Sequence, residues 1–129
     1  MNVVTDLFSE DFNSDRRVQE LVSRAKFTNI SLATIVADDK EEYTREELAK
    51  AEDYLLKYKV DAAFAVGNIG DNTVSISARS REKVNVGDVM HELEGGGNQF
   101  SGATKLKDIT SEEAGKKLIK VLTPPFYIE

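Results

Sequence analysis

Apolar residues recur along this chain with two periods, and these periods predict the order of its elements. Residues 14–25, 44–59 and 110–121 carry apolar side chains three and four positions apart, which is typical of helices with one buried face. A shorter segment of the same kind covers residues 86–93. Two of these helices have a clear start, because Thr44 with Glu47 and Thr110 with Glu113 fit the capping-box pattern.

The remaining apolar segments have the pattern of strands. Residues 30–37 and 60–66 are short, nearly continuous apolar runs, as in strands buried on both faces. Residues 73–78 alternate apolar and polar side chains, as in a half-buried strand, and residues 102–106 form one more candidate. The turn-rich residues 67–72 predict an antiparallel hairpin between the second and third strands.

This order predicts a single α/β (α+β) domain with a mixed sheet of about four to five strands flanked by helices. We assign residues 14–125 to the domain, with Pro124 and Pro125 ending the last helix. Residues 1–13 have little periodicity and are interpreted as a lead-in or linker, and residues 126–129 as a C-terminal tail. The adjacent Arg16 and Arg17 are interpreted as solvated surface.

Composition narrows the possible functions. The 129 residues carry a formal net charge of −6, which argues against a non-specific DNA or RNA coat but permits one local site for a small anion. The chain has no cysteine, so a disulfide framework and thiolate chemistry are excluded. No apolar run is long enough to span a membrane, and we expect a cytoplasmic domain, with a membrane anchor upstream in the full-length protein left open.

Few residues suggest catalysis within this chain. His91 is the only histidine, so any nucleophile–histidine pair would depend on it. Asp38 and Asp39 are read as a turn, because no histidine lies near them in sequence to complete a metal site. The sequence therefore predicts no catalytic residue and no metal ligand in these 129 residues.

A glycine run after the third helical segment is the strongest candidate for binding. Gly95, Gly96 and Gly97 allow positive φ and close approach of a ligand, and successive free N–H groups can bind an anion. Arg79 and Ser80, at the end of the third strand, would add a guanidinium suited to phosphate. Asn98 could donate its amide. The structural alternatives are a flexible connection capped by Gly95 and a surface ion pair of Arg79.

These residues also carry a resemblance. Residues 76–80 (ISARS), residues 84–86 leading into a helix, the glycine run and residues 102–104 together resemble the DHH-associated C-terminal domain (DHHA, first type) of DHH-family phosphoesterases. The similarity covers residues 30–122. It is greatest to the C-terminal part of bacterial cyclic-di-AMP phosphodiesterases, followed by oligoribonuclease-type members that cleave short RNAs.

Two features depart from the family pattern. The family loop has four glycines followed by histidine, whereas here Glu94 and Asn98 occupy the first and last of these positions. The family's metal ions, usually manganese, are held by a preceding DHH domain, and the chain has no Asp-His-His motif. The resemblance therefore implies a substrate-binding part whose catalytic domain is in the same or another chain, with no cofactor of its own and no activity alone.

The resemblance also implies partners and roles. Cyclic di-AMP, linear di-adenosine phosphate or a short RNA would be the nucleotide substrate, held through Arg79 and the loop from Gly95 to Asn98. A DHH catalytic domain would be the protein partner, and a homodimer is possible under this interpretation. The alternative function is a non-catalytic interaction or oligomerisation module with a degenerate nucleotide pocket.

Overall fold

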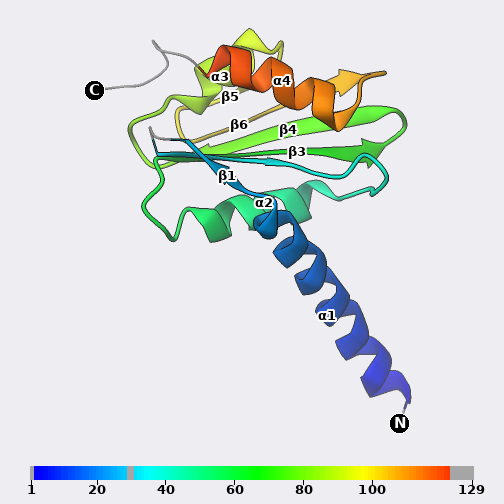
Figure 1. Ribbon diagram of the computed structural model, residues 1–129. Helices are drawn as coiled ribbons and strands as arrows, with labels where there is room; N and C mark the ends of the chain where they lie inside the picture. Colours follow the sequence, from blue (N-terminus) through cyan, green and yellow to red (C-terminus); the bar gives the residue numbers. More distant parts are fainter. Residues whose placement is uncertain (1, 29–30, 123–129) are drawn as a thin grey trace.

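One mixed sheet forms the middle layer of the molecule, with two helices on each side of it (Figure 1). The computed structural model describes residues 2–28 and 31–122, with side chains from Phe12 onward. The sheet has six strands in the order β1-β2-β3-β4-β6-β5. Only β2 and β3 are parallel, and the other neighbours are antiparallel.

The elements follow the predicted order. The strands are β1 (Lys26–Phe27), β2 (Leu32–Val36), β3 (Ala62–Gly70), β4 (Thr73–Ser80), β5 (Gly96–Gly97) and β6 (Ser101–Lys107). The helices are α1 (Asn2–Ser23), α2 (Arg45–Leu55), α3 (Val86–Glu92) and α4 (Ser111–Val121). Helix α2 connects the parallel strands β2 and β3, as parallel pairing requires a crossover.

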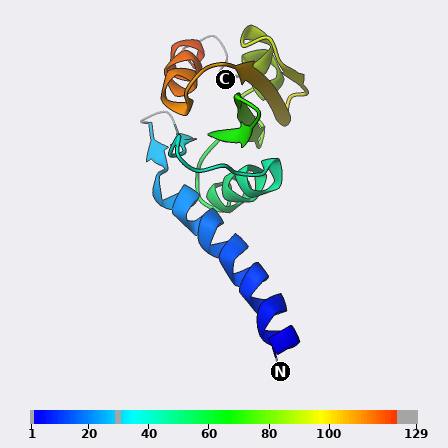
Figure 2. The same cartoon turned by 90° about the vertical axis from the view of Figure 1, so that its right-hand side faces the viewer.

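The two faces of the sheet bury separate cores. Figure 2 shows α1 and α2 on one face and α3 and α4 on the other. On the α3/α4 face the largest buried side chains include Phe64, Ile76 and Met90. On the α1/α2 face they include Leu21, Ile35 and Leu48. Because side chains alternate along a strand, consecutive residues of β3 serve opposite cores, whereas β4 contributes apolar side chains only to the core on the α3/α4 face.

The predicted fold class is confirmed, and the sheet has slightly more strands than predicted. The hairpin of β3 and β4 forms as expected, and both predicted capping boxes are present at Thr44 and Thr110. The additional strands β1 and β5 are only two residues long, too short to give a periodic signal. The predicted tail, residues 126–129, and the two prolines lie outside the described residues.

Helix α1 differs from the prediction, because it begins at Asn2 rather than near Ser14. Residues 2–23 contain no glycine or proline, so nothing in the sequence interrupts the helix before Ser14. Its N-terminal part projects away from the sheet (Figure 1), and Phe12 remains exposed. The interpretation of residues 1–13 as a linker stays a prediction. None of the described helices is both long and apolar enough to cross a membrane.

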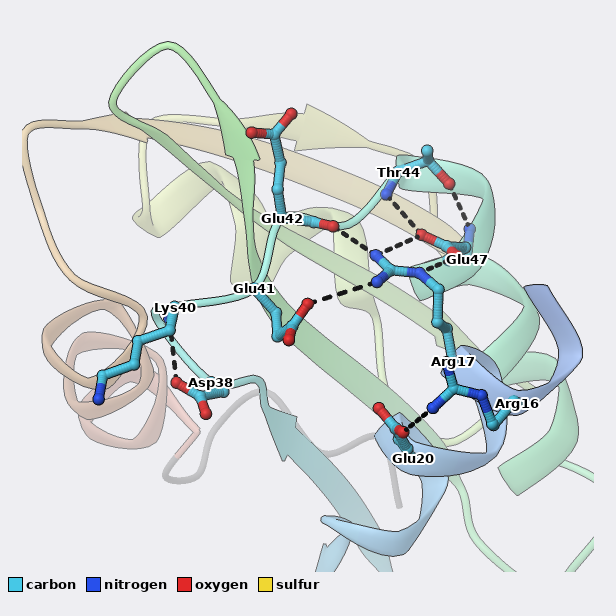
Figure 3. A network of polar contacts seen from close by, with 9 residues as sticks. All are labelled: Arg16, Arg17, Glu20, Asp38, Lys40, Glu41, Glu42, Thr44 and Glu47. Atoms are coloured by element: carbon cyan, nitrogen blue, oxygen red, sulfur yellow. Dashed lines mark hydrogen bonds and ion pairs between the residues drawn. The ribbon is translucent and has the colours of Figure 1, made fainter. Parts of the chain in front are cut away.

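Arg17 fixes the C-terminal half of α1 to the segment before α2 (Figure 3). Its guanidinium donates to both carboxylate oxygens of Glu47, at 2.8 and 3.3 Å, and to the carbonyl of Glu42. It also lies 4.6 Å from the centre of the Tyr43 ring. The interpretation of Arg17 as solvated surface is therefore wrong, whereas Arg16 pairs with Glu20 at an exposed site.

Candidate functional site

The glycine run begins where α3 ends. Asn85 caps the start of α3 through its side chain, which accepts from Asp88 N–H. At the other end, Glu94 adopts a left-handed conformation with φ of +64°, and Gly95 N–H donates to the Met90 carbonyl at 2.7 Å. This is the Schellman arrangement, in which the left-handed residue is usually glycine. The structural alternative with Gly95 as the capping residue is wrong by one position, because Glu94 has that role.

Gly95 and Gly97 are required by packing within the chain itself. A Cβ on Gly95 would overlap the Ala103 carbonyl and the Thr104 side chain, and a Cβ on Gly97 would overlap the backbone of residues 101 and 102. Gly97 also has φ of +142°. Gly96 differs from both, since a Cβ there would meet nothing within 4 Å and its φ lies outside the left-handed region. Packing within the described chain does not explain why residue 96 is glycine.

The run does not form the expected cradle of free N–H groups. Gly95 N–H is used by the Met90 carbonyl, and Gly96 and Gly97 form β5, paired in register with β6. Asn98 N–H donates to the Ser101 carbonyl. Along an antiparallel ladder, pairs of residues that exchange hydrogen bonds alternate with pairs that do not. The alternation directs the Gly97 N–H away from β6, at the edge of the sheet. Among the three glycines, the Gly97 N–H is thus the backbone donor that points out from the edge of the sheet.

Asn98 and Ser80 hold the turn between β5 and β6. The Asn98 Oδ1 accepts hydrogen bonds from the N–H groups of Phe100 and Ser101, at 2.8 and 3.0 Å. The Ser80 hydroxyl donates to the Gln99 carbonyl at 2.9 Å. The carbonyl oxygen of the Asn98 side chain is therefore occupied by the turn, and only its amide NH₂ is left to contact a ligand.

A hollow of about 390 Å³ lies between α3 and the glycine run. Its lining residues are polar or glycine: Asn85, Gly87, Asp88, His91, Gly96, Gly97, Asn98 and Gln99. His91 is exposed and is the only lining side chain able to carry a positive charge. Arg79 does not line this hollow, so the structure does not bring the arginine and the glycines together there.

Arg79 instead lies on the opposite face of the sheet, beside α2. Its side chain is 42% exposed, and its guanidinium lies 3.2 Å from an Asp53 carboxylate oxygen and 4.0 Å from Glu52 Oε1. Two residues earlier, the Ser77 hydroxyl donates to Glu52 Oε2 at 3.1 Å. Arg79 therefore forms an ion pair in the structure, as the structural alternative predicted.

Register places Gly96 on the same face as Arg79. Ser77 on β4 pairs with Ala103 on β6, and Ala103 pairs with Gly96 on β5. Directly paired residues in an antiparallel sheet point to the same side. Arg79 and Ser101 are the next pair along the two strands whose side chains point to that side. We name this surface the β6 platform: Arg79, Ser101, Ala103, Lys105 and Gly96, of which the last four are exposed.

Glu52 lies beside this platform on the same face of the sheet, where it contacts Ser77 and Arg79, and it is fully buried at 0% exposure. Burial raises the pKa of Glu52 well above its ordinary value, and the hydrogen bond from Ser77 and the charge of Arg79 only partly oppose this effect. Its Oε1 atom has no hydrogen-bond partner among the described residues. Glu52 was not predicted as a site residue, although the sequence holds one signal: Glu52 follows Leu48 by four residues and so lies in the apolar stripe of its helix.

The residues that the structure describes do not fit a metal ion. Within residues 2–28 and 31–122, no group of three or more His, Cys, Asp or Glu side chains could hold one.

Comparisons with known proteins agree with the resemblance found in the sequence. The chain is 41% identical over 91 residues to the cyclic-di-AMP phosphodiesterase GdpP of Bacillus subtilis (strain 168), covering 70% of this chain and 14% of that protein. It is 32% identical over 121 residues to the cyclic-di-AMP phosphodiesterase PdeA of Listeria monocytogenes, covering 93% of this chain and 18% of that protein. The chain thus spans less than a fifth of the length of these relatives.

A solved structure shares the fold. An exopolyphosphatase-related protein from Bacteroides fragilis superposes with a TM-score of 0.67 at 18% identity, over 84% of this chain and 32% of that one. A model of the DHHA1 domain family matches residues 16–123. This match covers most of the chain and includes β4, α3, the glycine run and β6. The chain therefore belongs to the DHHA1 domain family.

Proposed function

We propose that this chain is the substrate-binding part of a DHH-family phosphodiesterase that acts on cyclic di-AMP or on short oligonucleotides such as linear di-adenosine phosphate. The observation that carries the proposal is the shared face of Arg79 and Gly96. A half-exposed guanidinium and a glycine without an internal packing role lie on one open surface. Similarity to two cyclic-di-AMP phosphodiesterases supports the choice of ligand.

The dimensions of the β6 platform suit a dinucleotide. Gly96 lies two strands away from Arg79 across the sheet and two residues away along the strands. This geometry corresponds to about 12 Å between their Cα atoms. In the proposed complex, Arg79 binds a phosphate that is not cleaved, because its planar donors fit phosphate oxygens. The sugar or base lies against Gly96, where a side chain would keep it away from the backbone. Ser80, Gly95, Gly97 and Asn98 support the shape of the turn.

Catalysis in this proposal belongs to a DHH domain in the same or another chain. Manganese held by that domain would activate the attacking water, and this chain would orient the substrate. Correct orientation alone can lower a barrier by several kcal/mol, on the order of 7 in favourable cases.

An amide NMR titration of the 129-residue chain with linear di-adenosine phosphate tests the proposal. We expect shift changes at Arg79 and at residues 95–98, and their loss in Arg79→Ala. Arg16→Ala is the matched control, because it removes the same charge at an exposed, distant site. No shift changes at millimolar ligand would contradict substrate binding, and changes that survive in Arg79→Ala would contradict the role of Arg79.

Gly96→Ala gives a second test that does not disturb the fold. The added methyl group has open space around it, and alanine has less freedom than glycine in the unfolded chain, so the unfolding midpoint should not fall below that of the original chain. If a ligand approaches the backbone here, its affinity should fall at least tenfold, since about 1.4 kcal/mol corresponds to a factor of ten. Unchanged affinity would remove Gly96 from the site.

The alternative function is an interaction or oligomerisation module that has lost its nucleotide pocket. Asn98 favours it, because the family has histidine at this position and the Asn98 carbonyl oxygen is used by the turn. This alternative predicts a defined homo-oligomer or heteromer without nucleotide binding. Analytical ultracentrifugation of the chain, with and without cyclic di-AMP, distinguishes it from the proposal above.

A further inference from the structure

Glu52 is a buried acid that the proposed substrate site does not use. It lies on α2 at 0% exposure, beside Arg79 of the β6 platform. One of its oxygens, Oε2, accepts a hydrogen bond from Ser77. The other, Oε1, has no hydrogen-bond partner among the described residues and lies 4.0 Å from Arg79 Nε. A fully buried carboxyl oxygen without a partner is rare in native proteins and calls for an explanation.

The charged groups around Glu52 are few. Strand β4 contributes Arg79, and α2 contributes the neighbouring Asp53. Strand β3 contributes no charge, but a backbone hydrogen bond at Ala65 also favours the ionised form of Glu52. Arg79 is the only cation among these groups, so it alone supports the ionised form of Glu52 by its charge. Asp53 competes for the same guanidinium from an exposed position.

We propose that Glu52 is a positioning residue for Arg79, holding its guanidinium on the β6 platform until a ligand phosphate displaces it, and that this exchange couples ligand binding to proton uptake by Glu52. The proposal rests on the function proposed above. When a phosphate neutralises Arg79, Glu52 loses its one supporting charge. An ionised carboxylate left in that environment is strongly disfavoured, so it takes a proton from solvent.

The coupling is reciprocal. If ligand binding favours protonated Glu52, then protonation of Glu52 must favour ligand binding by the same factor. Affinity for a phosphodiester should therefore increase as pH falls through the titration range of Glu52. Typical coupling of this kind changes affinity on the order of fivefold or more.

Cyclic di-AMP is the suitable probe, because its phosphodiesters lack the second ionisation near pH 6 that a terminal phosphate has. Its affinity for the 129-residue chain is measured by calorimetry between pH 5.5 and 8.5. We expect tighter binding at the acidic end for the original chain and a smaller pH dependence for Glu52→Gln. His91 faces the glycine run from α3, and because both proteins retain it, the difference between them isolates Glu52.

Asp53→Asn is the matched control, since Asp53 is the other acid paired with Arg79. It removes a competing charge that remains exposed, so affinity should rise at every pH while the pH dependence stays. Glu52→Met is a second variant, should the buried amide of glutamine disturb folding. A pH dependence equal in the original chain and in both Glu52 variants would overturn the proposal.

A ligand-free measurement separates failure of this inference from failure of the proposed function. Carboxyl ¹³C NMR follows the ionisation of Glu52 in the original chain and in Arg79→Gln, which removes the supporting charge. We expect the midpoint for Glu52 to rise in Arg79→Gln, and an unchanged midpoint would overturn the inference. If the midpoint rises but cyclic di-AMP does not bind, the coupling between the two residues stands and the proposed ligand is wrong.

Discussion

Glu94 has a backbone conformation that glycine adopts more easily. Its φ of +64° closes the end of α3, its side chain is exposed, and a non-glycine residue in this region is strained by roughly 1 kcal/mol. Glu94→Gly should therefore raise the free energy of unfolding by about 1 kcal/mol, as measured by urea denaturation. Glu92→Gly, an exposed position within α3, should lower it instead. A destabilised Glu94→Gly variant would contradict this account of the helix end.

Glu52 should make the folded chain less stable as pH rises, which is the opposite of the effect of an acid whose pKa is lowered by folding. Its pKa is raised in the folded protein, so its stabilising contribution is complete below its ordinary value of 4.5 and is lost as pH rises through the folded value. Glu52→Gln does not ionise, so the variant should gain stability relative to the original chain as pH increases. We expect a gain of about 1 to 3 kcal/mol at pH 8 compared with pH 4.5, the range associated with an unsatisfied buried group.

Chemical denaturation of both proteins at the two pH values measures this gain. The other carboxylates are common to the two chains and cancel in the difference. A difference that is constant between pH 4.5 and pH 8 would show that Glu52 is not responsible.

At the scale of elements, Arg17 anchors α1 to the start of α2. Burial opposes ionisation of Glu47, but hydrogen bonds from Arg17 and Thr44 outweigh it and keep the pKa of Glu47 below its ordinary value. Arg17→Ala should therefore destabilise the chain by about 1 to 2 kcal/mol at pH 7. The loss should shrink as pH falls below 4.5, because Glu47 then becomes protonated in both proteins.

Arg16→Ala provides the comparison for this prediction within the same double arginine. Its partner Glu20 is one turn away and both side chains are more than half exposed, so the change should stay within about 0.5 kcal/mol. Thermal or urea unfolding of the two variants distinguishes them, and equal effects would contradict an anchoring role for Arg17.

Most helices and strands could be predicted from local sequence patterns. The features that could not be predicted depend on contacts between residues far apart in the sequence. The capping boxes at Thr44 and Thr110 were predictable because each depends on residues three positions apart. Strand β5 was not, since two glycines carry no periodicity and pair only because β6 lies beside them. Arg17 could not be distinguished from Arg16 by sequence, because its partner Glu47 is 30 residues away.

The candidate site shows the same limit at the scale of the whole molecule. Sequence motifs identified Arg79 and the glycine run and predicted that the two would hold one substrate together. The register of β4, β6 and β5 decides their relation instead: Gly96 shares a face with Arg79, whereas the polar hollow of the glycine run opens toward α3. A shift of one residue in any of these strand pairs would reverse the relation.

The exposed β6 platform also bears on catalysis by this chain. The described residues offer an open platform with one ion-paired arginine, and they hold no cluster of side chains that could bind a metal ion. We therefore expect that the 129-residue chain, incubated with cyclic di-AMP and manganese, releases no linear product above a protein-free blank. Anion-exchange chromatography of the nucleotides measures this. Hydrolysis that persists through repurification and disappears in Arg79→Ala would mean that the chain holds a complete active site, and the proposed dependence on a separate DHH domain would be wrong.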